Sequence, residues 1–200
     1  MMKGLLYKEW MLLRGPWLLL PILVGWPILL LGVVDFQMGM LGCMILSMIP
    51  IVLFQEDDRV GWEPFVGAMP VTPAQIVSAR YLLTLLLVGG GAVYSLLLGI
   101  WHCWGPAGLD LKMLGEGMMV VGTLALLVPI FWFPAFYRWG FVIGAIVNMG
   151  ILAVVCWACM WIKLMTDIPL YWVLIGSQPP LLALSWYLSI RGYERRRARA

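Results

Sequence analysis

Residues 81–101 read YLLTLLLVGGGAVYSLLLGIW, an uninterrupted run of 21 residues without a charged side chain. A helix needs about 20 predominantly apolar residues to cross a hydrocarbon core that is about 30 Å thick. A membrane-spanning strand is about half as long and alternates apolar with polar residues, a pattern that this run lacks. The run therefore predicts one transmembrane helix.

Five further apolar stretches of spanning length accompany this one. They are residues 17–34, 38–54, 117–137, 140–162 and 169–190. The chain is 63% hydrophobic and 12% charged, whereas soluble domains are about 45–50% apolar and 25% charged. A water-soluble globule is thereby excluded, in agreement with a mean hydropathy of +0.95. Because backbone polar groups in lipid must be satisfied within the segment, we predict an all-α membrane protein with six transmembrane helices.

The basic residues predict the orientation, since cytoplasmic loops carry an excess of Lys and Arg. With both termini in the cytoplasm, 11 basic residues lie inside and two, Lys112 and Lys163, lie outside. The inner residues are Lys3, Lys8, Arg14, Arg59, Arg80, Arg138, Arg191, Arg195, Arg196, Arg197 and Arg199. The last five form a basic cytoplasmic tail, residues 191–200, which suits anionic lipid headgroups and not nucleic acid.

The first segment, residues 1–16, precedes the six-span domain of residues 17–190. Met2, Leu5, Leu6 and Leu13 can share one helical face while Lys3, Glu9 and Arg14 point elsewhere. This pattern favours an amphipathic helix at the cytoplasmic headgroups, and a plain juxtamembrane segment is the alternative.

The chain carries no recognisable catalytic chemistry. No Gly-x-x-x-x-Gly-Lys-Ser/Thr loop is present to bind a nucleotide phosphate, and no catalytic residues are paired. Cys156 and Cys159 form a Cys-Trp-Ala-Cys motif, but the motif lies inside an apolar stretch, so small buried side chains are expected there and a disulfide is left open. We expect a protein that is not an enzyme and that binds neither a metal nor a cofactor.

Two polar features interrupt the predicted spans. Gly140, Gly144 and Asn148 recur every four residues and share one face of a helix, which predicts a close helix contact, either with a second copy or within one subunit. In the last span Gln178 precedes Pro179 and Pro180, which remove backbone donors and favour a kink. Gln178 and Pro179 are candidates for the lining of a cavity between two copies, and a packing kink is the alternative.

The inner loop of residues 55–80 is net acidic. Glu56, Asp57, Asp58 and Glu63 outnumber Arg59 and Arg80. Thr72 can cap a helix, Pro73 suits its first position, and Gln75 completes a capping box. A short cytoplasmic helix is therefore predicted. Headgroup binding does not explain an acidic segment, so the loop is interpreted as a docking site for a protein partner or as a plain solvated loop.

Several motifs resemble the membrane subunit of type-two ATP-binding-cassette (ABC) transporters, the six-span permeases that include exporters of phenol-soluble modulins and antimicrobial peptides. The matching motifs are MKGLLYKEW at residues 2–10, the acidic run followed by Gly61 and Trp62, MPVT at 69–72, QIVSARYL at 75–82, Phe133-Pro134, YRWG at 137–140 and the Arg-rich tail.

The resemblance implies a permease that pairs with a second copy or a related chain and works with two cytoplasmic ATPase subunits, which bind the ATP and Mg²⁺. It implies that the loop helix couples the two components through Glu56, Asp57, Asp58, Glu63, Thr72, Pro73, Ala74 and Gln75. It places the stripe at Gly140, Gly144 and Asn148 at the dimer axis. It also implies export of an amphipathic peptide or lipid-like substrate across a prokaryotic plasma membrane. A self-contained carrier or channel is the alternative, although the predicted spans hold almost no ionisable residues for an ion pathway.

Overall fold

The computed structural model describes residues 2–12, 41–61, 66, 70–104, 111–165 and 170–198. Within these ranges the regular structure is entirely helical, which confirms the all-α prediction for the described part of the chain. The helices are α1 (Met2–Leu12), α4 (Leu41–Val60), α6 (Pro73–Trp104), α7 (Leu111–Trp139), α8 (Phe141–Met165) and α9 (Leu170–Arg197).

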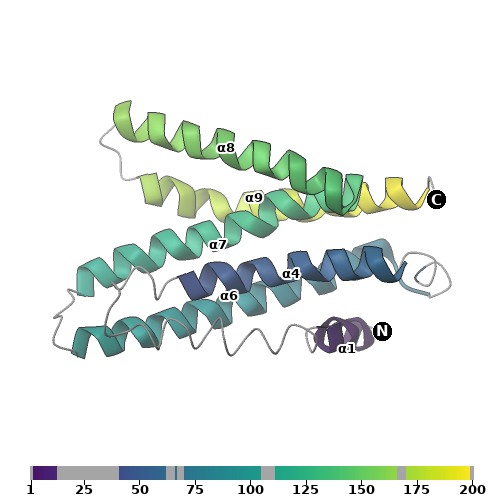
Figure 1. Ribbon diagram of the computed structural model, residues 1–200, viewed down its shortest axis with the longest axis horizontal. Coiled ribbons are helices and arrows are strands. Elements are labelled where there is room, and N and C mark those ends of the chain that lie inside the picture. The colour runs from purple at the N-terminus through teal and green to yellow at the C-terminus, as the bar shows by residue number, and fades with distance from the viewer. Residues whose placement is uncertain are drawn as a thin grey trace.

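The long helices run lengthwise along one elongated bundle (Figure 1). Helix α7 is its centre and contacts α4, α6, α8 and α9. The two ends of the chain lie at the same end of the bundle, where α1 packs against α6. Because α4 ends here, α6 begins here and α7 turns into α8 here, this end collects the polar junctions between helices.

Two described helices are long and apolar enough to cross a membrane, over Pro73–Trp101 and Gly117–Trp139. They contain the predicted spans 81–101 and 117–137. Phe141–Ile151 is a shorter apolar stretch within α8. The predicted span 17–34 lies outside the described residues, so the six-span topology, the position of the termini and the segment boundaries stay predictions.

Local sequence signals explain where helices stop. Gly61 follows α4 with φ 63° and Gly140 separates α7 from α8 with φ 82°. Both values fall in the left-handed region that ends helices and that glycine adopts without steric cost. The prolines at positions 50, 129, 134, 179 and 180 do not end their helices, and α9 continues through its proline pair.

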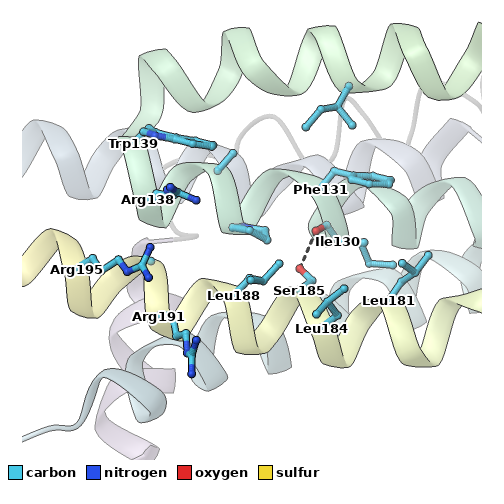
Figure 2. A pocket seen from close by; sticks show the side chains of 14 residues that line it. Ile130, Phe131, Arg138, Trp139, Leu181, Leu184, Ser185, Leu188, Arg191 and Arg195 are labelled. Atoms are coloured by element: carbon cyan, nitrogen blue, oxygen red, sulfur yellow. Dashed lines mark hydrogen bonds between the residues drawn. The ribbon is translucent and has the colours of Figure 1, made fainter.

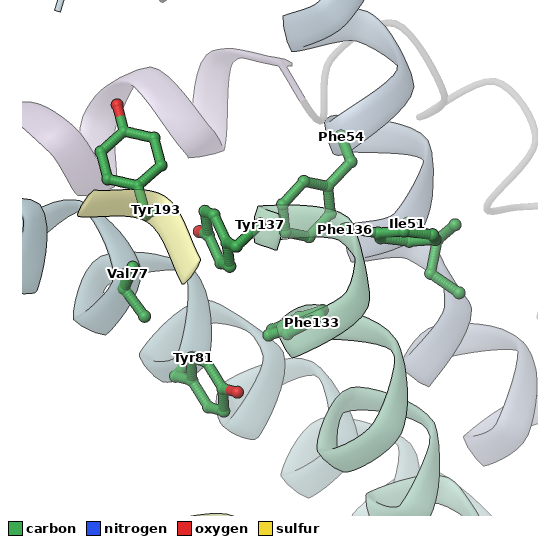
Figure 3. Packing of buried hydrophobic residues seen from close by; sticks show 8 residues of the cluster. All are labelled: Ile51, Phe54, Val77, Tyr81, Phe133, Phe136, Tyr137 and Tyr193. Carbon is green, nitrogen blue, oxygen red and sulfur yellow. The ribbon is translucent and has the colours of Figure 1, made fainter. Parts of the chain in front are cut away.

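The main core cluster lies where α4, α6, α7 and α9 meet (Figure 3). Its buried members are Ile51, Phe54, Val77, Tyr81, Phe133, Phe136, Tyr137 and Tyr193. The Phe54 ring meets the rings of Phe133, Phe136 and Tyr137 edge to face, with centroids 5.3, 5.2 and 4.9 Å apart. Such aromatic packing contributes about 0.5–1.5 kcal/mol per pair beyond the effect of buried area. It therefore stabilises the helix packing next to the polar end of the bundle.

Hydroxyl groups link the helices next to this core. The Tyr81 hydroxyl lies 2.6 Å from the Ser185 hydroxyl and 2.9 Å from that of Ser189. Ser185 also donates to the carbonyl of Ile130 at 2.7 Å. These bonds join α6, α9 and α7, and they satisfy buried polar groups that would otherwise be costly in an apolar environment.

Candidate functional site

The capping box predicted at Thr72 is present. The Gln75 backbone N–H donates to Thr72 Oγ1 at 3.3 Å, and the Thr72 backbone N–H donates to Gln75 Oε1 at 3.2 Å. Pro73 is the first residue of α6, and Ala74 follows it half-buried. The expectation of a separate short helix is wrong for these residues, because the capped helix runs 32 residues to Trp104. No glycine or proline lies between Pro73 and Gly89 to stop it.

A buried ion cluster lies two turns further along α6. One guanidinium nitrogen of Arg80 lies 2.7 and 3.0 Å from the two carboxylate oxygens of Glu9 and 2.5 Å from Asp57. Lys8 Nζ reaches the other Asp57 oxygen at 2.7 Å. Arg80 and Glu9 are 3% and 4% exposed, and the guanidinium stands 4.3 Å above the Phe54 ring. The cluster therefore ties α1, α4 and α6 together.

This geometry corrects the expectation for α1. Glu9 was expected to point away from the apolar face, but it is buried one turn after Leu5, which is 8% exposed. The carboxylate faces inward because Arg80 provides a buried cationic partner, and a paired charge is tolerated where an isolated one is not. The interfacial position of residues 1–16 stays a prediction.

The neighbouring carboxylate, Asp58, joins the other two helices at this end. One oxygen accepts a hydrogen bond from the Phe141 backbone N–H at 3.2 Å, at the start of α8. The other lies 3.1 Å from the guanidinium of Arg196 on α9. Since the N-terminus of a helix favours negative charge, Asp58 caps α8 while it holds α9.

The acidic run is thus largely neutralised inside the chain. Asp57 and Asp58 both have basic partners from distant segments, whereas Glu56 lies 3.8 Å from Arg59 in an exposed pair. Glu63 lies outside the described residues. The net acidity of the loop therefore no longer requires a basic partner, and the coupling role of these residues stays a prediction that rests on the family resemblance.

The stripe of Gly140, Gly144 and Asn148 faces inward. A Cβ at Gly144 would stand 2.4 Å from Phe136 Cδ1 on α7, and Asn148 is 1% exposed. The opposite face of α8 is exposed instead, with Val142, Ile146 and Met149 at 68–70%. At Gly144 the close contact is therefore made with α7 of the same chain, which is one of the two alternatives that the sequence left open. A contact of this stripe at a dimer axis stays a prediction.

Gln178 also packs inside the subunit. It is 7% exposed, and its side-chain amide donates to the Thr123 carbonyl on α7 at 3.4 Å. Pro179 is exposed. Neither residue lines the larger described pocket, which lies nearer the polar end between α7, α8 and α9. Their place in a cavity between two copies stays a prediction.

Sequence reasoning missed Glu9, Arg80, Arg196 and Tyr81 as organising residues. Arg80 is directly followed by a charge-free span, and Glu9 is the one acid in the first segment. When a basic and an acidic residue each border an apolar segment, they can be expected to form an ion pair. The reason is that an unpaired charge next to an apolar segment has a high free-energy cost. Their sequence separation of 71 residues hides the partner.

The structure is a bundle of long apolar helices, as expected of a membrane protein. Ion pairs and hydrogen bonds connect these helices at one end of the bundle. A family model described as ABC-2 family transporter protein matches residues 4–194. The chain therefore belongs to the ABC-2 transporter family and is the membrane component of an ABC transporter, a permease that is not itself catalytic. Permeases of this family generally work with a cytoplasmic ABC ATPase. Neither the comparison with curated proteins nor that with solved structures found a match.

Proposed function

We propose that this permease exports an amphipathic peptide or lipid-like substrate, as a dimer driven by two copies of an ATPase that binds the ATP and Mg²⁺. The family membership supports the transporter and its ATPase. The substrate class and the direction come from the resemblance of the loop motifs to peptide-exporter permeases. The prokaryotic plasma membrane is proposed on the same basis.

The coupling site is proposed at the capped start of α6. The observation that carries this proposal is the continuity of α6 from the Thr72 cap through the Arg80 cluster into an apolar span. A force applied at Pro73 would move the span directly, since no hinge intervenes. The ion pairs of Arg80 would transmit it to α1 and α4.

A path between two copies is proposed because the described part of one chain shows no pocket of the size of a peptide conduit. Its larger described pocket holds about 360 Å³, the size of a small-molecule site and not of a peptide conduit. The alternative, a self-contained carrier, would need ionisable groups along a membrane pathway. Among the described residues the buried ionisable pair, Glu9 and Arg80, lies at the polar end of the bundle instead.

The test places a photo-crosslinking amino acid at Val71, half-buried beside the cap, in the full chain co-expressed with its ATPase. The matched control carries the same group at Gly115, near the start of α7 at the opposite end, where a Cβ meets nothing within 4 Å. We expect an ATPase adduct from position 71 alone, and two permease copies per complex by native mass spectrometry. Equal labelling from both positions, or none from position 71, would refute the coupling site, and a single permease copy would refute the dimer.

A further inference from the structure

The larger described pocket opens between α7, α8 and α9 and does not include the coupling region. It holds about 360 Å³. Its body is apolar and includes Ile130, Phe131, Leu181, Leu184 and Leu188. The one hydroxyl in its wall, that of Ser185, is already bonded to the Ile130 carbonyl (Figure 2). The interior therefore offers apolar contact and no unused side-chain donor from that serine.

The pocket changes character along its length. Figure 2 shows Arg138, Trp139 and Arg195 toward one end and Leu181 and Leu184 toward the other. At about 1.5 Å per residue, the α9 wall from Leu181 to Arg191 spans about 15 Å. This length is about half of a hydrocarbon core, so the apolar part matches the depth of a single leaflet.

Three arginines at the polar end of the pocket form no ion pair with a carboxylate of the described residues. Arg138 stacks 4.8 Å from the Trp139 ring and Arg191 lies 4.6 Å from the Tyr187 ring. Within the described part of the chain, no carboxylate forms an ion pair with Arg138, Arg191 or Arg195. Among the described acids at this end of the bundle, Asp57 and Asp58 are held by other bases, and Glu194 on α9 forms no ion pair with these three arginines.

Several residues that line the pocket are exposed at the surface of the described bundle. Leu184, Leu188 and Trp139 in its lining are 53%, 46% and 43% exposed. A ligand that enters sideways would place its tail against the leucines and an anionic head at the arginines. Arginine is the side chain best suited to a phosphate, because its planar fork can donate two parallel hydrogen bonds.

We propose that this pocket binds an anionic phospholipid of the adjacent leaflet, with one acyl chain between α7 and α9 and its phosphate at Arg138 and Arg195. A neutral lipid fits the apolar part equally well but leaves the three cations without a counter-charge. A second copy of the chain would have to bring an acid to the same place, while Asp57 and Asp58 are engaged within their own subunit.

The test uses the full chain purified in detergent and titrated with dioleoyl phosphatidylglycerol or dioleoyl phosphatidylcholine, with bound lipid counted by native mass spectrometry. The double variant Arg138→Gln, Arg195→Gln removes two exposed charges. We expect phosphatidylglycerol to bind about 25-fold more weakly, at about fivefold per arginine near a lipid surface, with phosphatidylcholine unchanged. The control is Arg197→Gln, which removes an exposed tail charge outside the pocket lining and should change binding less than twofold.

Two further variants, Leu188→Trp and Leu184→Trp, fill the apolar part without changing the charge. Each should displace the phosphatidylglycerol adduct while helix content stays the same by circular dichroism. Equal losses in Arg197→Gln and the double variant would overturn the proposal in favour of diffuse attraction to the tail. Full binding by both tryptophan variants would place the lipid elsewhere, and a tryptophan variant that breaks a dimer while retaining lipid would assign the pocket to a second copy.

Discussion

Replacement of Gly144 by alanine should destabilise the contact between α7 and α8. A Cβ at this position would stand 2.4 Å from Phe136 Cδ1 and 3.1 Å from the Ala135 carbonyl carbon. The Phe136 ring cannot easily move away, because it is 1% exposed. Its centroid lies 5.2 Å from that of Phe54 and 5.4 Å from those of Trp132 and Phe141.

The magnitude follows from two opposing terms. An added methyl group in a packed core costs about 1–3 kcal/mol, whereas exchange of glycine for alanine inside a helix gains about 0.5–1 kcal/mol. Gly150 on the same helix isolates the second term, since a Cβ there meets nothing within 4 Å. We therefore expect Gly150→Ala to be neutral or stabilising. The free energy of unfolding of Gly144→Ala should be about 1–3 kcal/mol lower than that of Gly150→Ala.

The assay is a titration of the full chain with SDS in mixed micelles, with helix content followed by circular dichroism and the free energy of unfolding compared between the two variants. Phe136→Leu in the Gly144→Ala background should recover part of the loss, because the smaller side chain vacates the position of the new methyl group. Equal stability of Gly144→Ala and Gly150→Ala would refute the packing assigned to this stripe. So would a loss that depends on protein concentration, which would indicate a contact between copies.

Other variants test the buried ion cluster, the Thr72 cap and the packing of Gln178. Arg80→Gln removes the closer of two basic partners of the buried Glu9 carboxylate, which keeps a 3.4 Å contact with Lys8, and should cost about 3–5 kcal/mol. Arg59→Gln, in an exposed pair, should change the free energy by less than about 1 kcal/mol, and equal effects would contradict the buried cluster. Adding Glu9→Gln to Arg80→Gln should restore part of the loss, and a further loss would show that the two charges act separately. Thr72→Ala should weaken the start of α6 by about 0.5–2 kcal/mol, and hydrogen exchange that is unchanged at the first turn would count against the cap. Gln178→Leu should be nearly neutral, since its one bond is 3.4 Å long and its side-chain oxygen is buried without a partner in the described part of the chain; a loss above about 2 kcal/mol would show a polar partner that outweighs this bond.

Local signals in the sequence were sufficient to predict the apolar spans within α6 and α7 and the start of α6. Apolar length predicts the spans within α6 and α7, and the Thr72 and Gln75 pair predicts the start of α6. Both depend on interactions between residues close in sequence, and both are present in the structure. The short coupling helix was predicted wrongly from the same cap, because a cap fixes where a helix begins and says nothing about where it ends.

The sequence by itself determined the membrane class, the all-α composition and the helix boundary at Thr72, because hydropathy and capping are local properties of the chain. Only the tertiary structure decided which face of each helix turns inward. A four-residue stripe such as Gly144 and Asn148 marks a face but not the surface it meets, and at Gly144 that surface is Phe136 of α7 in the same chain. The partners of Glu9, Asp57 and Asp58 come from segments up to 138 residues away. Which charges meet is therefore settled by how the helices pack, since the free energy of a buried charge depends on the partner that packing supplies.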